Sequence, residues 1–230
     1  MVSRFDLYVI ISIRILKCVG ISMNNDCVFC YRKKLEKRIV GENDNFLVVP
    51  TFGQISNGGY LLLIPKQHIS CLGDMNRQQM EQCVSAIEEV QLAIQGEYKL
   101  SPITLFEHGI AGQTVKHAHL HFVPEICHLT ERIKKDFPEN EIQQIYFWQE
   151  LRSLYQKRKE PYLFWLGADA KMNVCWNPEA PPQYLRIVVA EAVGRPERGN
   201  WRDMDTELDE RLISETVERF KSLFSSWRDK

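Results

Sequence analysis

The chain has 230 residues, enough for one large domain or for one domain with an extension. Its composition, 44% hydrophobic and 26% charged, is typical of a water-soluble globular protein with a proper core. Lys and Arg number 29 against 30 Asp and Glu, and this formal net charge of −1 gives no electrostatic sign of a nucleic-acid-binding protein. A small anionic substrate stays open, because a few local cations and backbone amides suffice to bind a phosphate.

The cysteines and the first residues bear on the compartment. Seven cysteines is an odd number, so at least one is outside any disulfide, and we expect a reducing, cytoplasmic compartment. The apolar run 7–13 is interrupted by Arg14 and Lys17, which fits poorly with a membrane span or with the uninterrupted core of a signal peptide. We therefore expect residues 1–22 to be an upstream extension before a natural start at Met23, or a loosely packed arm.

Residues 46–123 are predicted to form strands with one long helix packed across them. A helix over 74–97 follows from apolar residues at helical spacing, with Asp74 as its N-cap and Gly96 able to end it. Turn residues and prolines bound the shorter apolar runs, which are predicted to be strands at 46–49, 59–64, 103–107 and 116–123. This combination of an antiparallel meander and a helix predicts an α+β fold.

Beyond about residue 130 the composition changes, and a mixed C-terminal extension is predicted. Residues 133–158 are charged and helix-like, and residues 206–227 form an amphipathic helix. Between them lie a predicted strand at 162–166, a loop at 177–182 and a short helix at 184–193 that Gly194 stops.

Three of the six histidines fall on alternate residues, at His117, His119 and His121. Successive side chains of a β-strand point to opposite faces, so these rings would line one face of the predicted strand 116–123 and be roughly 6.5–7 Å apart. The other face would carry the intervening apolar residues. A row of imidazoles on a rigid strand indicates a functional site rather than packing alone.

These residue types suit phosphoryl or nucleotidyl transfer. A neutral imidazole can act as the nucleophile and form a covalent intermediate, and flanking imidazoles can donate hydrogen bonds to phosphate oxygens. The strand is preceded by Gly112, Gln113 and Thr114. The glycine lets the backbone approach a ligand closely, and the other two offer an amide, a hydroxyl and a backbone N–H.

Two segments resemble the signature of the histidine-triad family of nucleotide hydrolases and transferases. Residues 112–124 are similar to its histidine motif, with hydrophobic residues at the intervening positions, and residues 59–69 are similar to its Gly-His-Leu-Leu-Ile-Pro-Lys-x-His segment. The resemblance covers about residues 24–125. It implies a histidine-triad domain at 23–130 and a C-terminal extension at 131–230, as in longer bacterial members.

The resemblance also implies roles for the motif residues. The middle histidine, His119, matches the nucleophile that attacks the α-phosphate, and His117 and His121 match the flanking histidines that contact the phosphate. A third histidine in place of glutamine favours hydrolysis over transfer to another phosphate. The expected substrate-binding residues are Gly112, Gln113, Thr114 and Glu107.

The family often has Asp or Asn before the glycine turn to contact the ribose, whereas residues 50–53 offer no carboxylate here. The base and the leaving group therefore stay open. We expect a nucleotide hydrolase that cleaves a phosphoanhydride or phosphoramidate bond in a dinucleoside polyphosphate or nucleoside phosphoramidate. The alternatives are a nucleotidyltransferase or phosphorylase, and a nucleotide-binding module with little turnover.

A metal site is the next possibility. Cys27 and Cys30 form a Cys-x-x-Cys pair, which alone fits a redox pair or an incidental one. The resemblance implies a structural zinc held by Cys27, Cys30, His68 and His117, since four such ligands make a closed tetrahedral site. A catalytic zinc on the three alternate histidines is a different reading, but three in a row on one straight strand cannot easily reach one ion. No organic cofactor is expected.

The C-terminal arginines have two readings. Arg186, Arg195 and Arg202 lie on a solvated face, or one of them reaches the phosphate chain of a long substrate. The expected partners are a small-molecule nucleotide and, through the long helix and the sheet edge, a second copy of the chain. The extension would either mask that dimer surface or build a different one. No nucleic acid and no membrane are expected.

Overall fold

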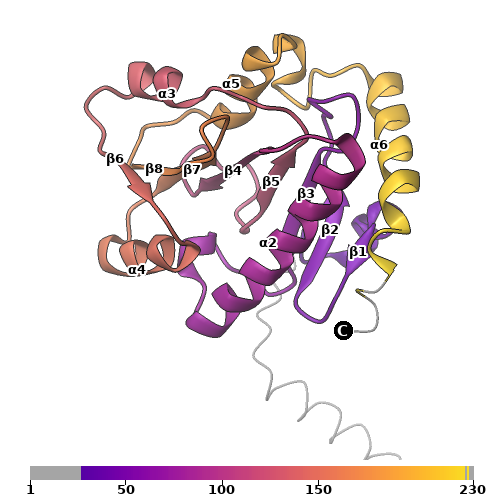
Figure 1. Cartoon of the computed structure of the whole chain (residues 1–230), viewed down its shortest axis with the longest axis horizontal. Helices are drawn as coiled ribbons and strands as arrows, with labels where there is room; N and C mark the ends of the chain where they lie inside the picture. Colours follow the sequence, from indigo (N-terminus) through magenta and orange to yellow (C-terminus); the bar gives the residue numbers. More distant parts are fainter. Residues whose placement is uncertain (1–26, 226, 228–230) are drawn as a thin grey trace, which may run out of the picture.

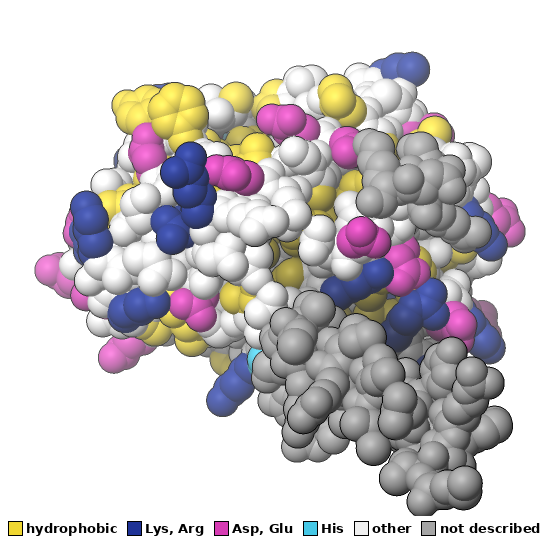
Figure 2. All heavy atoms as spheres, turned by 90° about the horizontal axis from the view of Figure 1, so that it is seen from below, with side chains coloured by type: hydrophobic (Ala, Val, Ile, Leu, Met, Phe, Trp, Pro, Cys, Tyr) yellow, Lys and Arg dark blue, Asp and Glu magenta, His cyan; other side chains and the backbone are white. Residues whose placement is uncertain are grey.

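The structure is a computed structural model that describes residues 27–225 and 227. The predicted extension at 1–22 lies outside these residues. Among the described helices, none combines the length and the apolarity that crossing a bilayer requires. On the face in Figure 2, basic and acidic side chains are interspersed over the described surface, in keeping with the near-zero net charge.

Within the described residues, the strands form one eight-stranded antiparallel sheet in the order β1-β2-β3-β5-β4-β7-β8-β6 (Figure 1). The expected α+β class with an antiparallel sheet is confirmed, and so are the strands predicted near residues 46, 59, 103 and 162. The predicted meander is wrong, because β5 lies between β3 and β4, and α2 makes the crossover from β3 to β4. The strands are β1 (Gly41–Glu42), β2 (Phe46–Pro50), β3 (Leu61–Pro65), β4 (Thr104–Gly109), β5 (Leu120–Val123), β6 (Ile142–Ile145), β7 (Tyr162–Leu166) and β8 (Met172–Trp176).

The C-terminal extension continues the sheet. Strand β7 pairs with β4 along its whole length, from Leu105 opposite Leu166 to Gly109 opposite Tyr162. The edge of β4 is thereby masked within one chain. Strands β8 and β6 were not predicted, because β8 carries Asn173 and β6 carries two central glutamines in place of a continuous run of β-branched or aromatic residues.

The helices differ from prediction mainly at their ends. Helix α2 (Arg77–Tyr98) begins after Asn76, whose side chain forms a reciprocal capping box with Gln79, and not after Asp74. It also runs through Gly96. The predicted helical region 133–158 divides into helix α3 (Thr130–Asp136), strand β6 and helix α4 (Trp148–Arg158). Helices α5 (Tyr184–Ala192) and α6 (Thr206–Lys221) are shorter than expected.

Helices cover both faces of the sheet. Helix α2 packs on one face in the largest core cluster, together with residues of α4 and α6. On the other face, α3 and α5 pack on the C-terminal strands, while Leu35 packs on β2 and β3. Leu35 lies between two short 3₁₀ helices, η1 (Arg32–Lys34) and η2 (Glu36–Arg38). The candidate site lies on this second face.

Candidate active site and metal centre

The histidine segment joins the sheet later than the predicted strand 116–123. Strand β5 begins at Leu120, so His117 and His119 precede it and His121 lies within it. The reason is that the backbone N–H of Ala118 donates to a loop carbonyl after β3 instead of to a strand. The intervening side chains do pack in the core with α2, as expected: Ala118, Leu120 and Phe122.

His119 is held so that one ring nitrogen stays available. Its Nδ1 lies 2.6 Å from the backbone oxygen of His117. A carbonyl oxygen only accepts, so Nδ1 carries the hydrogen and Nε2 keeps its lone pair. Burial lowers the pKa of His119 to about 4, with the Arg186 charge adding to the lowering and the His117 carbonyl opposing it. The ring is therefore neutral near pH 7.

His121 is held in a different way. Its Nδ1 lies 2.7 Å from the hydroxyl of Tyr60, and its ring stacks on Phe106 with centroids 4.2 Å apart and planes 10° from parallel. Its Nε2 is buried and has no hydrogen-bond partner in the described part of the chain. The His119 and His121 rings are neighbours, 4.8 Å apart.

Both rings line a cavity of about 250 Å³. Strands β3, β4 and β5 contribute to its wall, together with the 3₁₀ segment and the start of α5. Its charged lining residues are Lys34, Arg38 and Arg186, and no carboxylate is among the described residues that line it. Burial lowers the pKa of Arg38 to about 10, against the nearby charge of Asp209. The cavity therefore suits an anionic ligand.

The C-terminal extension supplies part of this cavity. Arg186 is only 4% exposed, so the solvated-face reading is wrong for it. Trp201 lies beside Phe52 at the cavity, with ring centroids 6.5 Å apart. The other two arginines are placed differently. Arg195 forms an ion pair with Glu125, and Arg202 stacks on the Trp201 ring.

The residues of the turn before the histidines have two different roles. Gly112 has a φ of +69°, and a Cβ there would lie 2.7 Å from the carbonyl oxygen of Pro181, so the turn favours glycine. Gly112 and Thr114 line the cavity, and their role in substrate binding stays a prediction. Gln113 does not line it. Its amide donates to the backbone oxygens of Ser70 and His117 and thereby holds the segment in place.

Glu107 is not at the cavity, which corrects its expected role in substrate binding. It shares a face of β4 with Leu105, on the side of α2, and its carboxylate accepts from the backbone of Leu72 and the hydroxyl of Tyr162. The next residue, His108, faces the cavity instead, and its Nε2 accepts from the backbone of Leu185 at 3.1 Å. The alternation of a strand carries this signal, since adjacent residues cannot share a face.

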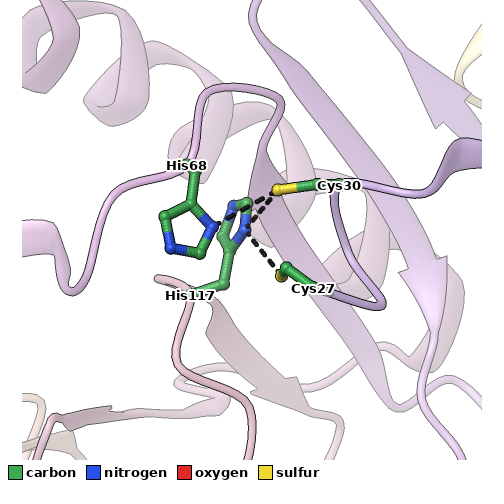
Figure 3. A group of neighbouring side chains, drawn as sticks. All are labelled: Cys27, Cys30, His68 and His117. Carbon is green, nitrogen blue, oxygen red and sulfur yellow. Dashed lines mark hydrogen bonds between the residues drawn. The ribbon is translucent and has the colours of Figure 1, made fainter. Parts of the chain in front are cut away.

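The four expected metal ligands converge (Figure 3). The ligand atoms of Cys27, Cys30, His68 and His117 all lie within 4.8 Å of one another. His117 Nδ1 is 3.4 Å from the sulfur of Cys27 and 3.5 Å from that of Cys30, and His68 Nδ1 is 3.3 Å from Cys30. Tetrahedral zinc with ordinary bond lengths separates nitrogen and sulfur ligands by about 3.5 Å.

The second nitrogen of His117 supports the same fit. Its Nε2 lies 2.7 Å from the carbonyl oxygen of Pro65, which can only accept, so the hydrogen sits on Nε2 and the Nδ1 lone pair faces the thiols. His117 is absent from the residues that line the cavity. The donor set therefore fits a closed zinc site, and His117 lies among these donors instead of at the cavity wall.

The two sites touch through one loop. Phe29, between the two cysteines, packs edge-on against the His119 ring with centroids 5.1 Å apart and against the His117 ring at 5.8 Å. Phe29 and its neighbour Val28 also line the cavity. The metal ligands thus hold a wall of the cavity as well as the segment that leads to His119.

Comparison with known proteins identifies the family. The HIT domain matches residues 32–128. An uncharacterized HIT-like protein of Mycoplasma genitalium is 30% identical over 107 residues, which are 44% of this chain and 74% of that protein. The chain belongs to the HIT family. Helices α5 and α6 lie outside the matched residues.

Two other proteins show how far the similarity extends. A protein of Schizosaccharomyces pombe named bis(5′-nucleosyl)-tetraphosphatase (asymmetrical) is 31% identical over 86 residues, or 36% of this chain, and the match spans 43% of its length. The crystal structure of a hypothetical histidine triad nucleotide-binding protein from Sulfolobus tokodaii matches with a TM-score of 0.44 and 17% identity, over 87% of this chain and 95% of that one.

Proposed function

We propose that the protein is a nucleotide hydrolase that cleaves a phosphoanhydride or phosphoramidate bond at the α-phosphate through a covalent intermediate on His119. One observation carries the proposal. The His119 ring is locked by the His117 carbonyl with Nε2 unprotonated, in a cavity whose charged lining residues are cations. A nucleophile and an anion-binding environment are the two requirements of nucleotidyl transfer to a side chain.

The reaction has two displacements. In the first, the Nε2 lone pair of His119 attacks the α-phosphorus, a nitrogen–phosphorus bond forms, and the bond to the leaving group breaks. In the second, water attacks the same phosphorus and releases a nucleoside monophosphate, and the electron pair returns to His119. The buried Nε2 of His121 lies beside the nucleophile and supports the role of a donor to a phosphate oxygen.

A structural zinc is part of the proposal. Cys27, Cys30, His68 and His117 would hold it, and it would fix the N-terminal loop to the segment before β5. Four side chains would close the ligand set, so the ion would stabilise the site instead of activating a water.

The test is a substrate panel with the wild-type protein and His119→Ala side by side. We expect the wild type to release monophosphate from at least one dinucleoside polyphosphate or nucleoside phosphoramidate, and the variant to lose turnover by about 10³-fold or more. Capture of labelled nucleotide on the wild type after a base or denaturant quench, with release of the label in mild acid and no label on the variant, would support the intermediate.

Three outcomes contradict the proposal. Retained turnover in His119→Ala would overturn the mechanism. Binding of nucleotides by the wild type with no turnover of any member of the panel would favour a nucleotide-binding module. Products that appear only when an acceptor such as phosphate is added would favour a transferase.

A further inference from the structure

Arg186 is the strongest feature that the proposed mechanism leaves unused. It comes from helix α5, outside the residues that match the HIT domain, and it reaches the cavity beside the histidines. Its Nη1 donates to the hydroxyl of Tyr60 at 3.0 Å, and its Nη2 donates to the carbonyl oxygen of Gly53 at 2.7 Å. These neutral partners fix the side chain and leave its charge uncompensated.

No carboxylate within the described residues forms an ion pair with Arg186, which is 4% exposed. Arg195, nine residues along the same segment, pairs with Glu125. A buried charge without a counter-ion is costly, and its ordinary remedy is a bound ion of opposite sign. The Nε of Arg186 is also buried and has no partner in the described residues. A substrate phosphate would supply that opposite charge.

The Tyr60 hydroxyl connects Arg186 to His121 by two hydrogen bonds. A guanidinium only donates, so the Tyr60 oxygen accepts from Arg186. The buried hydroxyl hydrogen then finds its acceptor when it is directed to His121 Nδ1, 2.7 Å away. Burial raises the pKa of Tyr60 to about 12, so the hydroxyl keeps this hydrogen at neutral pH. The proton of a neutral His121 ring then sits on Nε2, the buried atom beside His119.

We propose that Arg186 is the residue that binds the substrate phosphate and that, through Tyr60, positions His121 as an Nε2–H donor to the same group. The inference rests on the proposed function for the identity of the substrate as a nucleotide. It makes the C-terminal extension a necessary part of the site. The neighbouring rings consequently differ, because His119 offers a lone pair and His121 offers a hydrogen.

The first experiment measures binding and needs no turnover. Affinities for adenosine and guanosine 5′-monophosphate and for the two nucleosides are compared in wild type, Arg186→Ala, Arg186→Lys and the matched control Arg195→Ala. We expect Arg186→Ala to weaken monophosphate binding by about 10- to 100-fold, the range for a charged hydrogen bond, and nucleoside binding by less than about 2-fold. Arg186→Lys should fall between, and Arg195→Ala should match wild type.

Unchanged monophosphate affinity in Arg186→Ala would overturn the inference. An equal loss of affinity for monophosphate and nucleoside would also overturn it, because a merely structural role gives that result. A wild type that binds monophosphate no more tightly than nucleoside would overturn it as well. Thermal unfolding reports whether Arg186→Ala folds. If it does not, Arg186→Lys carries the same comparison.

The second experiment follows the hydrogen on His121. Nitrogen-15 NMR of the wild type should show the Nε2–H form of His121, and Tyr60→Phe should shift the ring toward a mixture of the two neutral forms. Turnover should fall in Tyr60→Phe, because the lost hydroxyl is the donor to His121 and also a partner of Arg186. Wild-type shifts in Tyr60→Phe would overturn the relay. An inactive wild type would count against the hydrolase alone, since binding and NMR do not depend on turnover.

Discussion

The HIT-matched segment and the C-terminal extension contribute to the same cavity in different ways. The first supplies its chemistry from a short local motif, in which His119 and His121 lie two residues apart, and Cys27 and Cys30, just before the matched residues, lie three residues apart. The extension supplies its share from separated points, with Arg186 on α5 and Trp201 in the following loop. Residues that act together can be recognised in a sequence when they lie close along the chain. Cavity residues that are far apart in the sequence can be recognised only in the folded structure.

The extension also holds a loop of the matched segment. Between β2 and β3, the backbone N–H groups of Gly53 and Gln54 donate to the carboxylate of Asp209 on α6, each at 2.9 Å. The hydroxyl of Thr216, also on α6, accepts from Gly59. This loop carries Phe52, which lines the cavity. The extension therefore shapes the site even where it does not enter it.

The largest effect should come from the metal ligands, which test whether the matched segment depends on zinc. Cys27→Ser/Cys30→Ser should lower bound zinc from near one per chain to near zero, because serine is a poor ligand for this ion. Loss of a structural metal should destabilise the fold on the order of 4 kcal/mol and lower Tm by roughly 10 °C.

Metal analysis and thermal unfolding check this prediction. Cys175→Ser serves as the control, since that buried thiol lies in the core cluster packed by α3 and α5 and is not one of the four proposed ligands. Zinc retained by the double variant, or a wild type purified without any metal, would remove the zinc site and return the pair to a redox or incidental reading.

Much of the matched segment could be predicted from its residues. Strands β2, β3 and β4, helix α2 and the core residues between the histidines follow from periodicity, and the convergence of Cys27, Cys30, His68 and His117 follows from the family resemblance. The place of β5 between β3 and β4 does not, because the sequence predicts a simple meander. Glu107 could not be placed this way. Its resemblance to a family position does not show that a buried tyrosine, Tyr162, would arrive from the extension to bind it.

The extension could be predicted only in part. Tyr162–Leu166 is continuous and apolar and was legible as a strand, but β6 and β8 are recognisable chiefly by their pairing with each other and with β7. Arg186 follows a helical pattern that equally predicts a solvated face. Its burial depends on Tyr60 and Gly53, more than 120 residues away, and no local pattern contains that information.

Removing the Asp209 carboxylate of α6 should have an intermediate effect on stability. This variant tests whether the C-terminal extension shapes the cavity through the loop between β2 and β3. Asp209→Ala leaves two buried N–H groups without their acceptor, so we expect a loss of about 2–3 kcal/mol in unfolding free energy. Because the loop carries Phe52, KM should rise by several-fold while kcat changes less.

Steady-state kinetics and denaturant unfolding measure these quantities. Asp205→Ala is the control, because its side chain caps the same helix at Leu208 and does not contact the loop. Equal changes of KM in the two variants would show that α6 acts through general stability and not through the loop.

The smallest effect concerns the seam between the two regions, where Glu107 of β4 accepts from Tyr162 of β7 and Leu72. Burial raises the pKa of Glu107 from its ordinary 4.5 to about 7, with both hydrogen bonds opposing the rise. Cys71 and Cys83 face the same carboxylate, and burial raises the pKa of both thiols well above neutral pH. Glu107 is therefore the group of this cluster that titrates between pH 4.5 and 7.

In that window the folded protein keeps a proton on Glu107 that the unfolded chain has released. Stability should therefore fall as the pH rises from about 4.5 to 7, by about 1–3 kcal/mol in total, and the contribution should be level above pH 7. Glu107→Gln keeps the shape and removes the titration, so the difference in unfolding free energy between wild type and variant isolates this group. A difference that stays constant from pH 4.5 to 7 would show that the seam keeps Glu107 ionised, and that the hydrogen bonds from Tyr162 and Leu72 outweigh its burial.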